Sequence, residues 1–266
     1  MEKIKAGFTG FVLGDWLGVP YKGKGQGTFK PIWTKSYLRG DKCSGNTSML
    51  LCALDSCCNL DVYQKNLKDW FFLKKFTGES IEFDVDQVTI KSIRRNFRGI
   101  SSDANSGNRA LMTSCVLAFS SLSKDEIIPF IKTTHNSRCS FQYNWFFIEF
   151  IRCLLKCDDK EKALKKAEKA CELQINRQNF CNGSFVVDTL ESAINWFMAG
   201  TDYKKCVFPA VNSGKSSDAV GALTGFLAGM HYGVEITNAV KGFEAIETYI
   251  DLFIDSLEAN RFNPSL

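Results

Sequence analysis

The chain has 266 residues, of which 45% are hydrophobic and 23% charged. This is the composition of an ordinary globular protein, and it excludes a disulfide-stapled mini-protein and a disordered chain. Lys and Arg number 33 against 29 Asp and Glu, a net charge of +4. So small an excess gives no reason to expect nucleic acid or a membrane surface as a partner. No apolar run approaches the ~18 residues needed to cross a bilayer, so no membrane span is expected.

The start of the chain and the cysteines both favour an intracellular, reducing compartment. Glu2 is an early acidic residue and no small-residue cleavage site follows it, which is unlike a secretory signal. The eleven cysteines are odd in number, scattered, and mostly embedded in apolar helical runs. We interpret them as reduced, buried thiols. Cys153 and Cys157 lack a second pair of ligands, so a structural zinc site is poorly supported.

Apolar residues recur at intervals of three and four along nearly the whole chain, which predicts an all-α protein. In chain order the pattern predicts helices over 4–18, 47–59 with Asn46 or Thr47 as N-cap, 111–119, 146–154, 159–174, 184–198 and 219–230. The segment 159–174 is the most solvated of these. The segment 219–230 carries small residues at close spacing, which predicts a place near the centre of a bundle. Since no linker or internal repeat marks a boundary, we expect one domain over 1–266.

Two local features carry no chemistry by themselves. The chain has only two histidines, His135 and His231, and nothing in their spacing places either beside a nucleophile. Each is expected to close or pack against a helix end. The sequence Gly214-Lys215-Ser216-Ser217 is not a phosphate-binding loop, because that motif needs a glycine where this chain has Pro209, and a preceding strand.

Six polar segments are informative when they are taken together and in order. They are 14–20 (GDWLGVP), 46–50 (NTSML), 106–112 (SGNRALM), 134–135 (TH), 183–193 (GSFVVDTLESA) and 210–222 (AVNSGKSSDAVGA). This series resembles the ADP-ribosylglycohydrolases, helical hydrolases that remove ADP-ribose from modified arginine or serine. The resemblance covers about residues 5–235. It implies a compact orthogonal helical bundle with the site at the loop ends, in agreement with the periodicity.

The resemblance also implies a centre of two magnesium or manganese ions, and at that centre the chain departs from the family. The family's Glu falls on Lys22, and its Thr-Asp-Asp run falls on Ser44, Gly45 and Asn46. Its late Asp-x-Asp-Thr run falls on 216–219, where only Asp218 is a carboxylate. Hard divalent cations are normally held by several carboxylates. We therefore expect no metal and no other cofactor.

In place of the metals, the Lys22 ammonium is expected to supply part of the lost positive charge near the ribose or phosphate. The side chains of Ser44, Asn46 and Ser216 would then hydrogen-bond the ribose hydroxyls. The alternative is that Lys22 points to water.

The nucleotide-binding half of the site follows the family more closely. Gly107 and Asn108 match the loop that lies along the pyrophosphate in the family. The family's next glycine corresponds to Arg109 here. The Arg109 guanidinium would either bind the phosphates through two hydrogen bonds or block the loop. The segment 183–185 precedes a helix whose N-terminal amides suit an anion. The expected substrate-binding residues are Lys22, Ser44, Asn46, Gly107, Asn108, Arg109, His135, Gly183, Ser184, Phe185 and Ser216, with Phe185 stacking on adenine.

Two functions from different classes follow from this resemblance. As a hydrolase, the chain would cleave the bond between ADP-ribose and a protein side chain, most simply arginine, and would need an acidic group for the oxocarbenium-like transition state. Asp218 is the candidate that matches the family, and Asp103, in the loop before Gly107, is the unmatched one; its alternative is a solvated or capping acid. As a binding module, the chain would hold ADP-ribose or an ADP-ribosylated protein without turnover. A monomer is expected, and delivery into another cell stays open.

Overall fold

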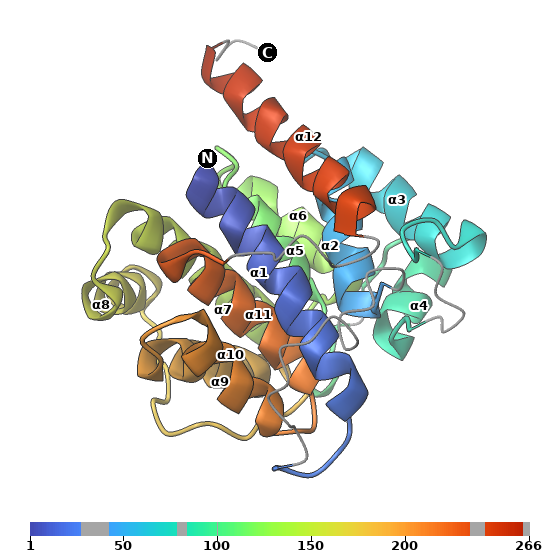
Figure 1. The fold of residues 1–266 in the computed structure, drawn as a ribbon. Helices are drawn as coiled ribbons and strands as arrows, with labels where there is room; N and C mark the ends of the chain where they lie inside the picture. The colour runs from blue at the N-terminus through green and yellow to red at the C-terminus, as the bar shows by residue number, and fades with distance from the viewer. Residues whose placement is uncertain (28–42, 79–83, 100, 235–242, 263–266) are drawn as a thin grey trace.

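The computed structural model describes residues 1–27, 43–78, 84–99, 101–234 and 243–262 (Figure 1). These residues form twelve α-helices and two 3-10 helices, which confirms the all-α prediction. The α-helices are α1 Glu2–Gly18, α2 Gly45–Asp55, α3 Leu60–Leu73, α4 Gln87–Arg94, α5 Ala110–Leu117, α6 Lys124–Thr134, α7 Arg138–Lys156, α8 Lys160–Cys171, α9 Val186–Ala199, α10 Tyr203–Asn212, α11 Ser217–Tyr232 and α12 Phe243–Phe262; the 3-10 helices are η1 Val19–Tyr21 and η2 Asp103–Asn105.

The centre of the bundle is the pair α1 and α11, which lie side by side (Figure 1). Glycines make their close approach possible. A Cβ atom at Gly14 would collide with the backbone of Gly221, and one at Gly10 with the backbone of Gly225. The prediction that the segment 219–230 lies near the centre is therefore confirmed, and every residue from Ser217 to Met230 is buried.

The other helices surround this pair. In Figure 1, α9 and α10 cover one side of α11, α2 leads to α3 and α4 on the opposite side, and α8 packs on the outside of α7. The last helix, α12, crosses α2 and lies beside the start of α1, where Lys5 pairs with Glu247 at 2.9 Å and Asp251 at 2.7 Å. Buried side chains from all the layers form one hydrophobic core.

Several predicted helix boundaries need correction. The helix predicted over 47–59 ends at Asp55, and the helix predicted over 146–154 begins at Arg138. The helix α2 begins at Gly45 and is capped by Ser44, whose hydroxyl accepts from the amides of Asn46 and Thr47, so the predicted N-caps lie inside the first turn. Ser44 offers the same kind of side-chain oxygen two residues before Asn46. The helix α8 ends at Cys171, because Glu172 takes a left-handed conformation.

The two histidines lie at helix ends, as expected from the sequence. His135 is the C-cap of α6, and His231 packs edge-on against Phe197 and Tyr232 in the last turn of α11. Within the described ranges, all eleven cysteines are free thiols. Among the same residues, none of the helices combines the length and apolar character that crossing a membrane requires.

Candidate active site

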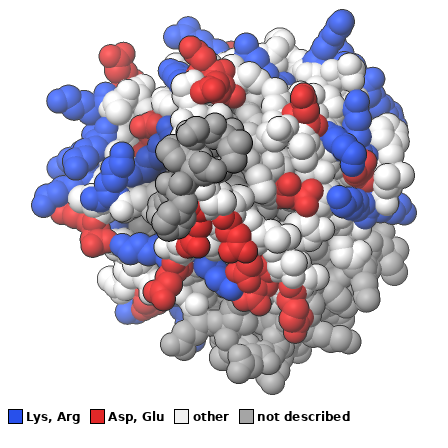
Figure 2. All heavy atoms as spheres, turned by 90° about the horizontal axis from the view of Figure 1, so that it is seen from above, with Lys and Arg blue, Asp and Glu red and all other residues white. Residues whose placement is uncertain are grey.

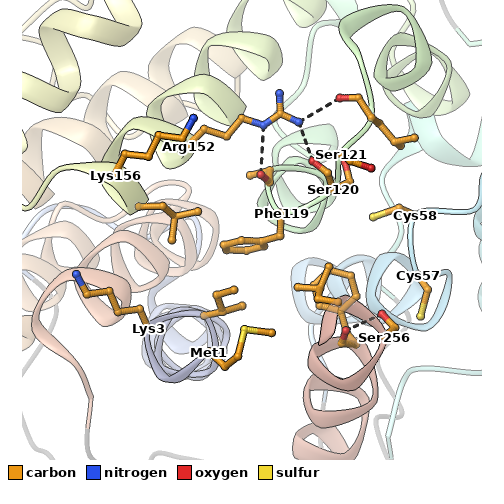
Figure 3. Close-up of a pocket in the computed structure, with 16 residues that line it drawn as sticks. Met1, Lys3, Cys57, Cys58, Phe119, Ser120, Ser121, Arg152, Lys156 and Ser256 are labelled. Atoms are coloured by element: carbon orange, nitrogen blue, oxygen red, sulfur yellow. Dashed lines mark hydrogen bonds between the residues drawn. The ribbon is translucent and has the colours of Figure 1, made fainter. Parts of the chain in front are cut away.

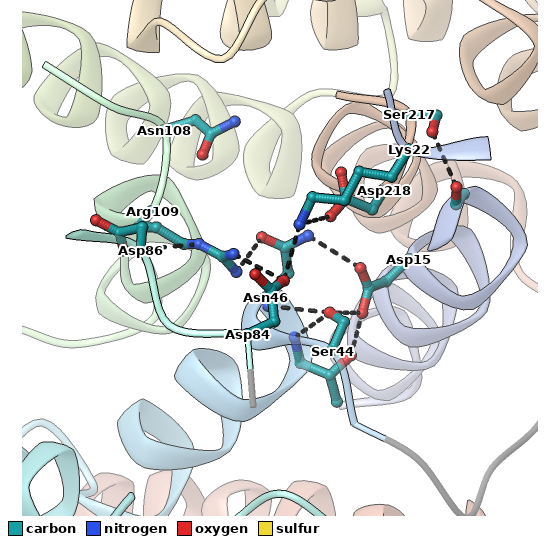
Figure 4. A network of polar contacts seen from close by, with 12 residues as sticks. Asp15, Lys22, Ser44, Asn46, Asp84, Asp86, Asn108, Arg109, Ser217 and Asp218 are labelled. Atoms are coloured by element: carbon teal, nitrogen blue, oxygen red, sulfur yellow. Dashed lines mark hydrogen bonds and ion pairs between the residues drawn. The ribbon is translucent and has the colours of Figure 1, made fainter. Parts of the chain in front are cut away.

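Three helix ends meet at one place: the C-terminal end of α1, the start of α2 and the start of α11. The close contact of α1 with α11 sets their relative position, and the Ser217 hydroxyl donates to the carbonyl of Gly18 at 2.9 Å. Asp15 on α1, Ser44 and Asn46 at the start of α2, and Asp218 on α11 therefore lie around one point (Figure 4). The sequence prediction that these segments share a site agrees with this geometry.

Asp15 is the fully buried anion of this group. Its carboxylate accepts from the Ser44 hydroxyl at 2.5 Å, the Thr47 hydroxyl at 2.5 Å and the Asn46 amide at 3.0 Å. Burial, together with the nearby negative charge of Asp218, raises the pKa of Asp15 to about 6, although the three donors oppose the shift. Asp15 thus ties the end of α1 to the first turn of α2.

Lys22 forms ion pairs with two carboxylates from distant parts of the chain. Its Nζ lies 2.8 Å from Asp84 and 3.0 Å from Asp218. The Asp218 side chain is only 3% exposed, whereas Lys22 is 44% exposed. Burial opposes the ammonium form, but the two carboxylates outweigh it and raise the pKa of Lys22. Lys22 is therefore directed into this cluster and not only toward water, and its role near a ribose or phosphate stays a prediction.

Arg109 approaches Asp84 from the other side (Figure 4). Its guanidinium donates to Asp84 at 3.0 Å and to the Asn46 side-chain oxygen at 2.8 Å, and it lies 3.7 Å from Asp86. Burial opposes ionisation of Asp84, but Arg109 and Lys22 outweigh it and lower the pKa of Asp84 to about 2. Arg109 is therefore turned into this cluster and is not left free to fork around a phosphate.

Gly45 explains why there is room for that guanidinium. A Cβ atom at position 45 would lie 2.6 Å from one terminal nitrogen of Arg109 and 2.9 Å from its Cζ, and it would collide with the backbone carbonyl of Asp84. A side chain at position 45 and an arginine at position 109 thus compete for the same space.

The expected nucleotide-binding segments meet beside this cluster. Gly107 pairs with Phe185 in an isolated antiparallel bridge, and the amide of Val186 at the start of α9 donates to Ser106 at 2.8 Å. His135 lies under Gly107, 1% exposed, with Nδ1 2.9 Å from the Thr134 hydroxyl and with no partner in the described structure for its buried Nε2. Burial lowers the pKa of His135, which favours the neutral ring.

The remaining predicted residues lie around this bridge or outside it. The Asn108 amide donates to Thr189 at 3.0 Å, and the Thr189 hydroxyl donates to the Gly183 carbonyl at 2.6 Å. Ser184 is exposed and Phe185 half-buried at the N-cap of α9. Asp188 lies in the first turn of α9, next to Gly183. Its carboxylate already interacts favourably with the positive end of the helix dipole, where an anion was expected to bind.

Two further predicted residues, Asp103 and Ser216, hydrogen-bond to residues outside the ion-pair cluster of Asp15, Lys22, Asp84, Asp86, Arg109 and Asp218. Asp103 is exposed and accepts from the amide of Cys139 at 3.3 Å, which is the capping alternative for this acid. Ser216 is the N-cap residue of α11 without a side-chain capping bond, and its amide donates to Asn182 at 3.0 Å.

Three acids of the cluster were not among the predicted site residues: Asp15, Asp84 and Asp86. Asp15 could have been recognised from the sequence, because it is a charged residue within the apolar run of α1 and a buried carboxylate needs partners. Asp86 could have been identified only as a helix cap, and it does accept from the Thr89 amide at 2.9 Å. Asp84 could not be recognised from its neighbours in the sequence. Its partners are Lys22, the residue after η1, and Arg109, the residue before α5.

The contacts at this point do not suit a pair of divalent cations. Metal ions need lone pairs from carboxylate, amide or hydroxyl oxygens. Here Ser44, Asn46 and Asp84 already accept from or donate to neighbouring side chains, and two cationic groups, Lys22 and Arg109, take the place beside Asp218 and Asp84. Within the described ranges, no group of three or more His, Cys, Asp or Glu side chains is arranged to hold a metal ion.

Comparison with known proteins places this all-helical fold in one class. The family model described as ADP-ribosylglycohydrolase matches residues 1–257. The solved structure titled "ADP-ribosylglycohydrolase-related protein complex" superposes with a TM-score of 0.77 at 21% identity, covering 96% of this chain and 98% of that one.

Two curated relatives are similar in sequence. An ADP-ribosyl-[dinitrogen reductase] glycohydrolase of Rhodospirillum rubrum is 35% identical over 54 residues, which are 20% of this chain and 18% of that protein. The ADP-ribosylarginine hydrolase Tri1 of Serratia proteamaculans (strain 568) is 22% identical over 275 aligned positions, which cover 88% of this chain and 72% of that protein. The chain belongs to the ADP-ribosylglycohydrolase family.

Proposed function

We propose that this protein hydrolyses the bond between ADP-ribose and a modified protein side chain, with arginine as the linked residue and without a two-metal centre. Family membership supports ADP-ribosyl hydrolysis, and the printed name of the relative from Serratia supports arginine. The observation that carries the proposal is the convergence of Lys22 and Arg109 on Asp84 and Asp218, where the family resemblance places metal ligands.

The charge of this cluster favours a cationic linked side chain. Four carboxylates, those of Asp15, Asp84, Asp86 and Asp218, face two cationic side chains. An excess of negative charge in a partly buried site attracts a cation more strongly than water would. The Asp84 side chain is 38% exposed, so it can reach a guanidinium that arrives from solvent.

Asp218 is the proposed general base. In the reaction, water adds to the anomeric carbon of the ribose, the carbon–nitrogen bond to the guanidine breaks, and the proton of the water passes through the carboxylate to the leaving guanidine. Lys22, 3.0 Å from Asp218, holds that carboxylate in place. Phe185 is proposed to stack on adenine and Gly107 to border the pyrophosphate.

One observation favours the second function, a binding module without turnover. The side chains of Ser44 and Asn46, which were expected to hold the ribose hydroxyls, are both engaged within the protein. Polar groups that already hydrogen-bond one another contribute less to stabilising a transition state, so such a site would accelerate hydrolysis less.

The two functions are separated by single-turnover hydrolysis of an ADP-ribosylarginine peptide, together with calorimetric titration of ADP-ribose. The hydrolase predicts release of ADP-ribose that falls by about 10²-fold or more in Asp218→Asn, because the general base is removed. Asp103→Asn is the matched acid-to-amide control and is expected to keep turnover. Binding of ADP-ribose without turnover by the unmodified chain would contradict the hydrolase and support the binding module.

A further inference from the structure

A cavity among the described residues lies away from the ion-pair cluster, near the opposite end of α1. It has a volume of about 720 Å³, which is within the range of small-ligand pockets. Its walls come from five segments: the start of α1, the α2–α3 connection, the end of α5 with the residues that follow it, α7 and α12 (Figure 3). Along α1, Ile4 in this cavity and Asp15 in the cluster are about 16 Å apart at 1.5 Å per residue.

The lining of this cavity combines apolar and cationic side chains, and none of its residues is acidic. Apolar residues from four of the segments form most of the surface, with Phe119 in the middle of the view in Figure 3. Lys3, Arg152 and Lys156 are the cationic residues, and Cys57 and Cys58 lie across the cavity from Arg152 and Lys156. An apolar surface with positive charge on one side suits a molecule with an apolar chain and an anionic head.

The three cations differ in how far their charge is already balanced. Arg152 is fixed by Glu149 at 3.0 Å and by backbone carbonyls, including that of Ser120 at 3.1 Å. Lys3 pairs with Asp158 at 2.6 Å, but both side chains are more than half exposed, so the pair exchanges readily with solvent or with another anion. Lys156 has no ion-pair partner among the described residues. Lys156 is therefore the first contact for an anionic head.

We propose that this cavity binds a long-chain fatty carboxylate, with the chain against Phe119 and the neighbouring apolar residues and the carboxylate at Lys156. The proposal is independent of the hydrolase function, because no lining residue belongs to the ion-pair cluster. An acidic peptide or a second copy of the chain would use the charge but would not need the apolar part of the cavity.

The test is calorimetric titration of the full chain with dodecanoate below its micelle concentration, compared with dodecanol and dodecylammonium. Dodecanoate is expected to bind about tenfold tighter than dodecanol, and dodecylammonium to bind weakest, because the lining holds no carboxylate. Lys156→Glu is expected to weaken dodecanoate binding by about tenfold or more, whereas Lys165→Glu, an equal charge change on the exposed face of α8, should leave it unchanged. Equal binding of the three amphiphiles would overturn the proposal.

A second readout locates the bound chain. Cys57 and Cys181 are the two exposed cysteines of the described residues, and only Cys57 lines the cavity. Bound dodecanoate is therefore expected to slow alkylation of Cys57 by a maleimide, measured by peptide mass spectrometry, and to leave Cys181 unaffected. Unchanged alkylation of Cys57 at saturating dodecanoate would contradict the site. Protection of Cys57 without ligand, accompanied by a dimer in light scattering, would assign the surface to a second copy instead.

Discussion

Positions 45 and 109 illustrate how one exchange of residues reshapes this site. The family resemblance places an aspartate at position 45 and a glycine at position 109, whereas this chain has Gly45 and Arg109. In the structure the Arg109 guanidinium fills the volume next to Gly45, so a side chain at position 45 would not fit beside it. Relative to the residues that the resemblance implies, this chain has one acid fewer and one base more at this point.

Removing Arg109 should therefore destabilise the fold. Arg109→Leu leaves Asp84 and Asp86 without their buried cation, and we expect a loss of about 2–3 kcal/mol in the free energy of unfolding, measured by urea denaturation. The matched control is Arg177→Leu, which breaks the exposed pair with Glu161 and should cost less than about 1 kcal/mol. Equal losses in the two variants would show that the Arg109 pairs add nothing through burial.

Asp15 gives the site a pH dependence of known sign. Its pKa in the folded protein, about 6, lies above the ordinary value of 3.8, so the folded state holds a proton that the unfolded chain releases earlier. Asp15 therefore contributes stability that is fully present below pH 4 and is lost as the pH rises through 6. Between pH 4.5 and 7 the loss from this group is about 2 kcal/mol. Urea denaturation at the two pH values should show this loss of stability in the unmodified protein and not in Asp15→Asn. The same pH dependence in the unmodified protein and the variant would contradict a raised pKa of Asp15.

At the scale of helices, the contact of α1 with α11 fixes the distance between Asp15, Lys22 and Asp218. Gly14→Ala tests this contact. Alanine would favour the helix itself by up to about 1 kcal/mol, but its Cβ meets the backbone of Gly221, which cannot move aside alone. We expect a net loss of about 2–3 kcal/mol and a lower melting temperature. Gly25→Ala, where a Cβ atom meets nothing within 4 Å, is the control, and a stable Gly14→Ala protein would argue against the close packing.

The helices show what could be predicted from the sequence and what could not. Apolar periodicity predicted α11 and its central place, since small residues at close spacing have few other uses in a soluble bundle. The N-cap of α2 was placed two residues too late, because Ser44, Asn46 and Thr47 are all residues that cap helices. Asp84 could not be predicted, because its role depends on a contact with Lys22 and Arg109 that only the tertiary fold creates. The fatty-carboxylate cavity, lined from five segments, is hidden from sequence for the same reason.

Across the whole molecule, the two ends of α1 lie in different chemical surroundings. One end carries the cluster of carboxylates and cations, and the other borders an apolar cavity without acids. Figure 2 shows Lys and Arg on both sides of the surface seen from above, with Asp and Glu interspersed among them. This mixed distribution agrees with the small net charge of +4.

We propose that Lys22 and Arg109 supply the positive charge that the family resemblance assigns to metal ions. Hydrolysis of an ADP-ribosylarginine peptide in excess EDTA, repeated with added Mg²⁺ or Mn²⁺, tests this proposal. We expect the same rate under both conditions and a loss of about 10²-fold in Lys22→Ala, because the removed ammonium leaves Asp218 without its counter-charge. A rate that vanishes in EDTA and returns with Mg²⁺ would contradict it.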